Sequence, residues 1–458
     1  MKKYLFSICC LLIAGYFLFP GKDARGQNEY NTYEAFQSFR TGKYKPEQLR
    51  EDLNFIYREL IKYHPQLYTY SSKDNMDLLL QSLNNEINGE LTIEEFYLLA
   101  TQLTDRVKCS HTGIRLPADY QNSIRAYGNF FPLKLFFSKG KAFYVLDDCN
   151  LSPSISPGTE IVSINNQPVG KIISRVFNFI PSEGNNTTTK YNELNRNFAA
   201  LFYYIDDSDE FVIDIKSESS DGTVTLPACR FSELSTVENL EESNRPVDFY
   251  YLEDNSIGIL KVPTFGIRDM NVYFQQLDSI FNEVKIKGTQ NLVVDLSDNN
   301  GGHPIFAAQL FSYFTNKDFI YFKRNEDVKD FEPLYNTMKP NAIHFDGNIF
   351  VLMNGGCLST TGHLISLLKY YTDAVFIGEE PGTSYRCNDF SIPLTLPNTG
   401  IGLNIPRTTF ETNVKGFTLN EPFPVDHYVS ITPVEIINGR DTYLEVVKEV
   451  IEKGAIPQ

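Results

Sequence analysis

The sequence has no tryptophan, no low-complexity tract and no internal repeat. Because 42% of its residues are hydrophobic and 21% are charged, the composition is that of a globular protein and excludes long disordered regions away from the termini. At 458 residues the chain can form two or three hydrophobic cores. This length excludes a single small binding module and allows a multidomain enzyme.

Basic residues are scarce compared with acidic ones. The chain carries 41 Lys and Arg against 57 Asp and Glu, which gives a formal net charge of −16 at pH 7. A surface of this sign repels the phosphates of nucleic acid and the head groups of anionic lipids. We therefore expect no nucleic-acid partner.

Cysteine and histidine lack the spacing of a metal site. Seven cysteines are present, two of them in the N-terminal apolar run, and no two form a C-x-x-C pair. The six histidines are scattered along the chain. We therefore expect neither a disulfide framework nor a zinc site, and we expect no cofactor. The remaining cysteines are Cys109, Cys149, Cys229, Cys357 and Cys387.

Long hydrophobic runs are absent except at the N-terminus. Met1-Lys2-Lys3 precedes an apolar run from Tyr4 to Phe19, and Ala24-Arg25-Gly26 has the small-x-small pattern of a cleavage site. We interpret residues 1–26 as a signal peptide cleaved before Gln27, and we expect an exported protein, periplasmic or extracellular, without a transmembrane span after cleavage. Cleavage removes four basic residues and one acidic residue, so the net charge moves from −16 to −19. An uncleaved anchor is the alternative, although the run is slightly short for a span.

The spacing of apolar residues changes along the chain. From 44 to 103 it is helical, with Leu49, Leu53, Ile56 and Leu60 on one face. Between 130 and 231 short apolar runs bounded by turn residues predict strands. From 248 onward apolar strands alternate with helices, which indicates an α/β domain. We expect a helical segment over 27–125, a strand-rich domain over 126–235 and an α/β domain over 236–458.

The strand-rich domain contains a motif with two turns. Ser156-Pro157-Gly158 leads into the strand 160–164, and Asn165-Asn166 predicts a tight turn after it. This arrangement resembles the core of a PDZ domain. PDZ domains bind extended peptide by adding it to a sheet edge, so the resemblance implies a domain that captures polypeptide.

The most informative segment, 351–362, is an apolar strand that ends in two glycines and small hydroxyl residues. It reads Val-Leu-Met-Asn-Gly-Gly-Cys-Leu-Ser-Thr-Thr-Gly, and an amphipathic helix follows. Such a turn can hold one hydroxyl at a helix N-terminus, where free N–H groups stabilise a developing oxyanion. Ser359 is therefore the candidate nucleophile. In the alternative interpretation, Ser359, Thr360 and Thr361 only cap the helix.

Two further segments accompany this turn. A buried strand over 291–296 runs into a polar turn with Gly301-Gly302, whose backbone can approach a ligand closely, and Gly378-Glu379-Glu380-Pro381-Gly382 comes later. In this order and at these spacings, the three segments resemble the C-terminal-processing (tail-specific) serine peptidases, including the tricorn core and retinoid-binding-protein-like branch. The resemblance covers essentially the whole exported chain. It implies a helical N-terminal segment, a PDZ-like domain and a crotonase-like α/β catalytic domain.

The resemblance also implies roles for matching residues. Ser359 takes the position of the nucleophile, and the N–H of Thr360 with that of Gly301 or Gly302 forms the oxyanion hole. One branch of the family uses a lysine after its G-E-P segment as the general base. This chain has Arg386 in that region and no lysine, and a guanidinium stays protonated.

The other branch takes its base from an upstream D-x-H-T-like motif. Here residues 107–112 read Val-Lys-Cys-Ser-His-Thr, so the resemblance implies that His111 is the general base. A glutamate near the C-terminus orients this histidine in that branch. The segment 419–426 occupies the matching region and makes Glu421 the orienting residue, with Glu379 and Glu380 as alternatives.

Three positions depart from the family pattern. Cys109-Ser110 replaces the expected acid-Gly pair, Ser297 an expected arginine, and Gly362 an expected glutamate. We therefore weigh an exported serine peptidase, which cleaves a polypeptide substrate through an acyl-enzyme, against an inactive relative that binds peptide or an apolar ligand. An esterase-like hydrolase with the same nucleophile is a third reading. Cys357 is a rival nucleophile, but its place on the approach turn favours a packing role.

Overall fold

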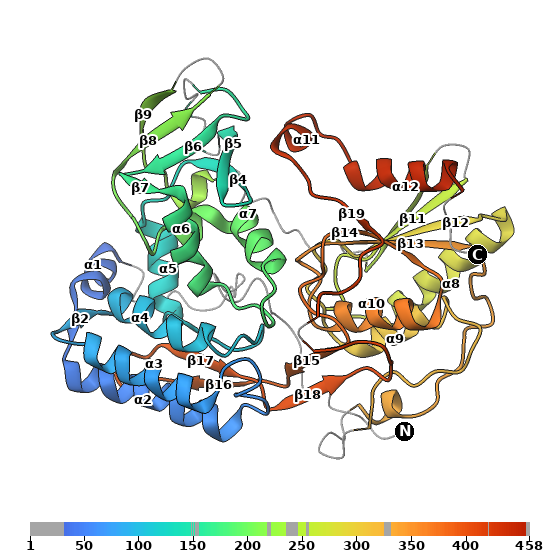
Figure 1. Cartoon of the computed structure of the whole chain (residues 1–458), viewed down its shortest axis with the longest axis horizontal. Helices are drawn as coiled ribbons and strands as arrows, with labels where there is room; N and C mark the ends of the chain where they lie inside the picture. Colours follow the sequence, from blue (N-terminus) through green and yellow to red (C-terminus); the bar gives the residue numbers. More distant parts are fainter. Residues whose placement is uncertain are drawn as a thin grey trace.

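The computed structural model describes residues 32–147, 149, 151, 155–217, 221–234, 246–252, 256–324, 331–419 and 421–454. The signal peptide expected over 1–26 lies outside these ranges. Figure 1 shows two lobes, one with the N-terminal helices and a first sheet, the other with a second sheet between helices. Within the described ranges, no helix combines the length and apolar character that a membrane crossing needs.

The N-terminal helices pack into one core with the first sheet. The elements are α1 (Tyr33–Thr41), β1 (Lys43–Tyr44), α2 (Pro46–Tyr63), α3 (Lys73–Glu86), β2 (Leu91–Thr92), α4 (Ile93–Asp105), β3 (Gly113–Arg115) and α5 (Ala118–Tyr127). Leu49, Leu53, Ile56 and Leu60 of α2 are all fully buried, which confirms the face predicted from their spacing.

The first sheet has the strand order β4-β5-β6-β8-β9, with β7 paired to β6. Its strands are β4 (Leu133–Ser138), β5 (Lys141–Asp147), β6 (Glu160–Ile164), β7 (Gln167–Pro168), β8 (Glu210–Lys216) and β9 (Asp221–Pro227). Helices α6 (Val169–Val176) and α7 (Thr188–Phe202) and the short 3-10 helices η1 (Phe177–Phe179) and η2 (Phe231–Glu233) complete this part. Asn165 and Asn166 have φ values of 47° and 62°, which confirms the tight turn predicted there.

The second sheet has the order β10-β11-β12-β13-β14-β19, and all its pairings except β10 with β11 are parallel. Its strands are β10 (Asp248–Leu252), β11 (Ile257–Lys261), β12 (Asn291–Asp295), β13 (Asn348–Met353), β14 (Val375–Gly378) and β19 (His427–Tyr428). Around it lie α8 (Met270–Lys287), α9 (Pro304–Phe311), η3 (Glu332–Tyr335), α10 (Thr360–Tyr371), α11 (Pro433–Ile437) and α12 (Thr442–Glu452).

Separate cores cover the two faces of this sheet. Leu292 and Val294 of β12 pack with α8, α9 and α10, whereas Val293 packs with α12. Both faces are buried, so the strands read as continuous apolar runs. The predicted α/β layering is confirmed, and the three glycine-bearing segments singled out above follow the carboxyl ends of adjacent strands β12, β13 and β14, where α/β proteins place their sites.

A long ribbon crosses between the lobes (Figure 1). It consists of β15 (Arg386–Asp389), β16 (Ile392–Thr395), β17 (Gly402–Ile405) and β18 (Thr408–Glu411). Strand β15 pairs with β18, β16 pairs with β17, and β17 pairs with β3 in the first lobe. Leu403 and Ile405 are buried in the core of the N-terminal helices. The ribbon thus joins the second lobe to β3. The spacing of apolar residues did not indicate that a segment of the second lobe pairs with a strand of the first.

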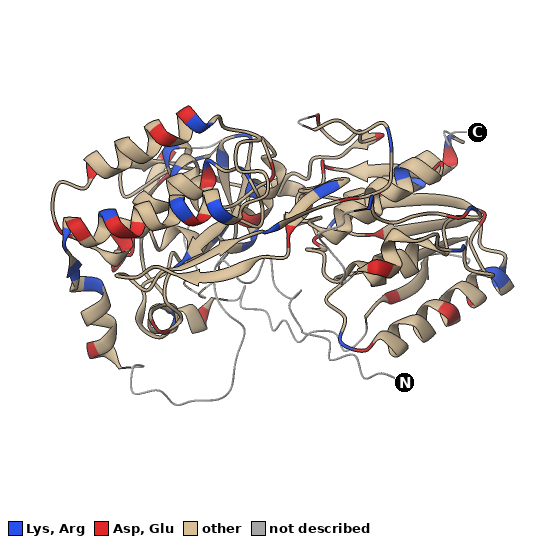
Figure 2. Cartoon of the chain, turned by 90° about the horizontal axis from the view of Figure 1, so that it is seen from below, with Lys and Arg blue, Asp and Glu red and all other residues tan. Residues whose placement is uncertain are grey.

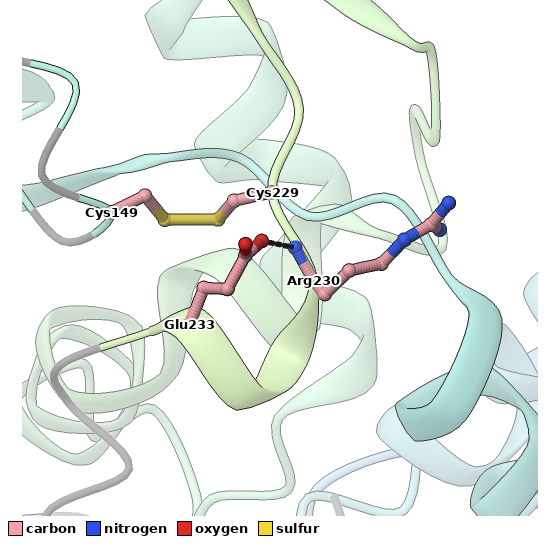
Figure 3. The surroundings of a disulfide bond; sticks show 4 residues. All are labelled: Cys149, Cys229, Arg230 and Glu233. Atoms are coloured by element: carbon pink, nitrogen blue, oxygen red, sulfur yellow. Dashed lines mark hydrogen bonds between the residues drawn. A yellow bond between two sulfur atoms is a disulfide. The ribbon is translucent and has the colours of Figure 1, made fainter.

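The prediction that the cysteines form no disulfide is wrong. Cys149 and Cys229, 80 positions apart in sequence, are joined by a disulfide bond (Figure 3). Beside it the Arg230 N–H donates to Glu233 Oε2 at 2.6 Å. The bridge joins the end of β5 to the segment after β9, which only the folded first sheet brings together. Widely spaced cysteines therefore gave no local signal of the pairing.

Candidate active site

The turn between β13 and α10 holds Ser359 in an unusual backbone conformation. Its φ is 52° and its ψ is −122°. A non-glycine residue in such a region costs about 1–3 kcal/mol, and such strain concentrates at functional sites. Hydrogen bonds fix the residue: its carbonyl accepts from the His363 N–H at 3.2 Å and from Thr383 Oγ1 at 3.4 Å. The fold thus presents one hydroxyl at the start of a buried helix.

The hydroxyl groups of this turn do not cap α10. Ser359, the N-cap residue, makes no capping bond with its side chain. Thr360 Oγ1 donates instead to the Gly302 carbonyl at 2.5 Å, and Thr361 Oγ1 donates to Asn299 Oδ1 at 2.7 Å. The interpretation that these residues only cap the helix is therefore wrong. The two threonines tie the turn to the neighbouring loop after β12.

That loop carries the glycine pair predicted to serve the oxyanion hole. A Cβ on Gly301 would lie 3.0 Å from the Thr360 nitrogen, and one on Gly302 would lie 2.1 Å from the carbonyl carbon of Phe265, so neither position has room for a side chain. The Gly301 N–H is already engaged, because it donates to Asn299 Oδ1 at 2.9 Å. Across the described residues, the N–H groups of Thr360 and Gly302 have no acceptor. Two free N–H groups thus remain near Ser359.

His111 lies in the first lobe, between α4 and β3, with its side chain 1% exposed. Its carbonyl accepts from Asn404 Nδ2 at 2.9 Å, which fastens it to β17 of the crossing ribbon. Nδ1 lies 3.0 Å from Ser110 Oγ. Nε2 has no hydrogen-bond partner among the described residues, and Asp389 Oδ2 lies 3.6 Å from it.

The electrostatics of His111 favour a neutral imidazole. Burial lowers its pKa, and the nearby Asp389 carboxylate opposes this shift in part. A neutral imidazole with an unbonded Nε2 can accept a proton at neutral pH. The residue therefore has the properties that a general base requires.

Strand β15 contacts both the histidine and the serine. Ser359 Oγ is 4.0 Å from Cys387 Sγ, and His111 Nε2 is 3.6 Å from Asp389 Oδ2. Cys387 and Asp389 are two residues apart on one strand, so their side chains share a face. The structure therefore brings Ser359 and His111 to the same face of β15. No hydrogen bond joins the two within the part of the chain described here.

A second histidine lies behind Cys387. His363 Nε2 is 3.5 Å from Cys387 Sγ, and the ring packs against Tyr321 and Phe322. Burial lowers the pKa of His363 to about 3, with His111 adding to the shift, and burial raises the pKa of Cys387 well above its usual value. The thiol and the imidazole are both neutral, so they do not form an activated thiolate pair. No sequence pattern pointed to Cys387, Asp389 or His363.

The structure does not bring Glu421 to His111. The Glu421 side chain is exposed, and across the described residues its carboxylate has no bonded partner. Its N–H donates to the Thr418 carbonyl at 3.3 Å, in a loop after the crossing ribbon. Burial raises the pKa of Glu379 and Glu380, the two alternatives, but neither has a described contact with His111.

Two other predictions concern the immediate surroundings of Ser359. Cys357 Sγ donates to the Leu296 carbonyl at 3.0 Å, and burial raises its pKa, so this thiol packs in the core and is not a nucleophile. Gly362 stands where the family often has a glutamate. A Cβ there would lie 2.4 Å from the Thr383 carbonyl oxygen, so the local packing admits only glycine.

Comparisons with known proteins address the family. Residues 256–421 match Peptidase family S41. This range contains the β12 and β13 turns and Glu421 but not His111. No curated protein matches the chain.

Among solved structures, mature CPAF complexed with lactacystin has a TM-score of 0.65 at 13% identity, with 89% of this chain and 98% of that chain covered. The photosystem II D1 C-terminal processing protease has a TM-score of 0.41 at 14% identity, with 83% and 93% covered. The likeness to CPAF shows a shared α/β fold. The match over 256–421 confirms the resemblance to the C-terminal-processing serine peptidases found in the sequence, and it supports a serine-type peptidase.

Proposed function

We propose that the chain is an exported serine peptidase that cleaves peptide bonds through an acyl-enzyme intermediate. One observation carries the proposal. Ser359 is held at φ 52° with no capping bond, beside the free N–H groups of Thr360 and Gly302 and on the same face of β15 as His111. A strained strand-to-helix turn with an uncapped hydroxyl is typical of serine nucleophiles.

The proposed reaction runs in two halves. Ser359 Oγ attacks the scissile carbonyl carbon while its proton passes to His111 Nε2, and the N–H groups of Thr360 and Gly302 donate to the oxyanion. The C–N bond then breaks as His111 returns the proton to the leaving amine, and an ester of Ser359 remains. A water molecule then gives a proton to His111 Nε2 as its oxygen attacks the ester carbonyl carbon. The bond from that carbon to Ser359 Oγ breaks, and His111 returns the proton to Ser359 Oγ. Before the first step, Ser359 Oγ must turn from Cys387 towards His111.

The finer architecture is part of the proposal. We assign residues 27–125 to the helical segment, 126–235 to a PDZ-like domain and 236–458 to a crotonase-like catalytic domain. The Asn165-Asn166 turn after β6 supports the PDZ-like reading, and the parallel strands β11 to β14 support the crotonase-like one. The composition of residues 1–26 and the Cys149–Cys229 disulfide support export, since disulfides persist in oxidising compartments.

The proposed partner is an extended polypeptide captured at the edge of the first sheet. In Figure 2 basic residues on the helices stand among acidic ones, and the net charge of −16 disfavours nucleic acid. Strand β4 ends the sheet order and lies against α7. The Phe137 N–H donates to Asn195 Oδ1 at 2.6 Å, and Asn195 Nδ2 donates to the Phe137 carbonyl at 3.3 Å. The Asn195 amide therefore occupies two groups that a captured peptide strand would use.

Helix α7 also contacts the nucleophile turn. Thr189 Oγ1 donates to the Gly355 carbonyl at 3.0 Å, and Asn192 Nδ2 donates to Asp298 Oδ1 at 2.8 Å. A captured peptide would displace the Asn195 amide from its hydrogen bonds to Phe137. This displacement would act on α7, whose first turns contact the loops around Ser359. This contact supports a link between capture and the site.

Replacing Asn195 by alanine is expected to strengthen peptide capture about tenfold, because the peptide no longer competes with two internal hydrogen bonds. The measurement is the fluorescence anisotropy of fluorescein-labelled β-casein in a Ser359→Ala background. Asn54→Ala is the matched control, since in the described residues that amide donates to the Arg50 carbonyl of its own helix and to no other group. If Asn195→Ala bound the labelled casein as weakly as the control or more weakly, the proposal that peptide is captured at this edge would be wrong.

A fluorophosphonate probe tests the nucleophile directly. We expect the purified chain to be labelled near neutral pH, with mass spectrometry placing the phosphonyl group on Ser359. Ser366→Ala, on the same helix and with its hydroxyl bonded to the Gly362 carbonyl, should be labelled like the wild type. Absence of labelling in the folded chain would contradict the proposal and favour the inactive, ligand-binding alternative.

A further inference from the structure

A serine separates His111 from the nearest carboxylate on its Nδ1 side. His111 Nδ1 lies 3.0 Å from Ser110 Oγ. The same hydroxyl lies 3.4 Å from Glu183 Oε2, and the Ser110 N–H donates to that oxygen at 3.4 Å. Ser110 and His111 are 3% and 2% exposed, so the contact between them is shielded from water, whereas the Glu183 side chain is half-buried. Ser110 is one of the residues that depart from the family pattern.

The fold fastens Glu183 to this position. The Gly184 N–H donates to the Lys108 carbonyl at 3.0 Å, which ties the loop before α7 to the segment before His111. Tyr70 donates its hydroxyl to Glu183 Oε1 at 3.4 Å, and its ring lies 3.0 Å from where a Cβ on Gly184 would be. Each carboxylate oxygen of Glu183 therefore has a donor from a different element of the first lobe.

Several charged and titratable groups act on this carboxyl group. Burial raises the pKa of Glu183 to about 7, against the opposing effects of the Ser110 and Tyr70 donors and of Arg386. Cys109 and Cys387 are the other titratable groups that interact with it. Above about pH 7 the carboxylate is ionised, and below that pH it becomes neutral.

The other acids fit the orienting role less well. Asp389 lies at Nε2, the atom that must exchange a proton with Ser359, and not at Nδ1. Glu421 is exposed, and its carboxylate has no bonded partner across the described residues. Only Glu183 reaches the Nδ1 side of the imidazole by contacts described in this structure.

The geometry points to Glu183 as the residue that positions His111, acting through the Ser110 hydroxyl. This inference rests on the proposed peptidase mechanism. Nδ1–H of His111 donates to Ser110 Oγ, and the Ser110 hydroxyl donates to Glu183 Oε2. When Nε2 takes the proton of Ser359, the imidazolium keeps its Nδ1–H bond, and the carboxylate stabilises its charge through the serine. No proton leaves the line of contacts, and Glu183 stays ionised throughout.

The test is the rate of fluorophosphonate labelling as a function of pH, between about pH 5 and pH 9. In the wild type we expect the rate to fall as the pH drops through about 7, where Glu183 is protonated. Glu183→Gln should lower the maximal labelling rate about 10²-fold. It should also shift the fall in rate at acid pH to lower pH, because the remaining titrating group is then His111, whose pKa is lowered by burial. A purely structural role for Glu183 would lower the rate without moving the limb.

Matched variants complete the test. Glu90→Gln, an exposed glutamate of the same lobe, should retain the wild-type profile. Ser110→Ala removes the hydroxyl between His111 and Glu183 without altering the carboxyl group, so it should lower the maximal labelling rate as Glu183→Gln does. This variant tests the inference if Glu183→Gln does not fold. The inference would be overturned if Glu183→Gln or Ser110→Ala kept the wild-type dependence of labelling rate on pH, or if Glu421→Gln alone lowered the labelling rate. If the wild type itself is not labelled, the proposed function fails instead.

Discussion

Replacing Ser359 by alanine is expected to lower kcat for peptide hydrolysis on the order of 10⁶-fold, because the acyl-enzyme can no longer form. The substitution removes one oxygen, whose nearest described partner is Cys387 Sγ at 4.0 Å. A contact of that length contributes little, and alanine tolerates φ 52° no worse than serine does. We therefore expect the free energy of unfolding of the variant to lie within a few tenths of a kcal/mol of the wild-type value. The measurement is a urea titration followed by circular dichroism.

The comparison variant for this experiment is Ser366→Ala. Ser366 is fully buried on α10 and donates to the Gly362 carbonyl at 2.8 Å, so it shares the helix and the burial of Ser359 but not its turn. Hydrolysis of fluorescein-labelled casein should persist in Ser366→Ala and vanish in Ser359→Ala. Residual hydrolysis in Ser359→Ala within tenfold of the wild type would mean that another group attacks the substrate.

Much of the second lobe could be predicted from the sequence because its strands are buried on both faces. The expected strand over 291–296 corresponds to β12 (Asn291–Asp295), and the apolar strand expected at the start of the segment 351–362 corresponds to the end of β13 (Asn348–Met353). The ends of such strands can be recognised in the sequence, because a continuous apolar run stops where a polar, glycine-bearing turn begins. The position of Ser359 followed from the same local pattern, since a strand, a glycine pair and a helix are adjacent in sequence.

The surroundings of His111 could not be predicted in this way. Asp389 and Cys387 reach the site because the crossing ribbon pairs with β3, and such pairing depends on the register between segments almost 290 positions apart. Glu183 reaches Ser110 through a loop of the first lobe whose own sequence indicates only a turn. The Cys149–Cys229 disulfide has the same origin, since the sheet order brings the two cysteines together. These contacts are set by tertiary packing and leave no local periodicity.

Replacing His111 by asparagine is expected to lower kcat/KM about 10⁴-fold, since the amide fills much of the space of the imidazole but cannot accept a proton. The measurement is hydrolysis of fluorescein-labelled casein near pH 8. His64→Asn is the matched control: this histidine is also buried in the first lobe, burial lowers its pKa to about 4, and it bonds to the Gln66 N–H. The control should keep its activity within about tenfold.

His363 offers the sharpest alternative to His111 as the base. In the described residues its imidazole approaches the Ser359 hydroxyl through the Cys387 thiol, and a pKa of about 3 makes it a poor proton acceptor. We therefore expect His363→Asn to retain far more activity than His111→Asn. Because a nucleophile and its base act as a unit, the Ser359→Ala/His111→Asn double variant should be no slower than Ser359→Ala alone. A further large loss in the double variant would mean that His111 acts independently of the serine, and the proton transfer assigned to it would then be wrong.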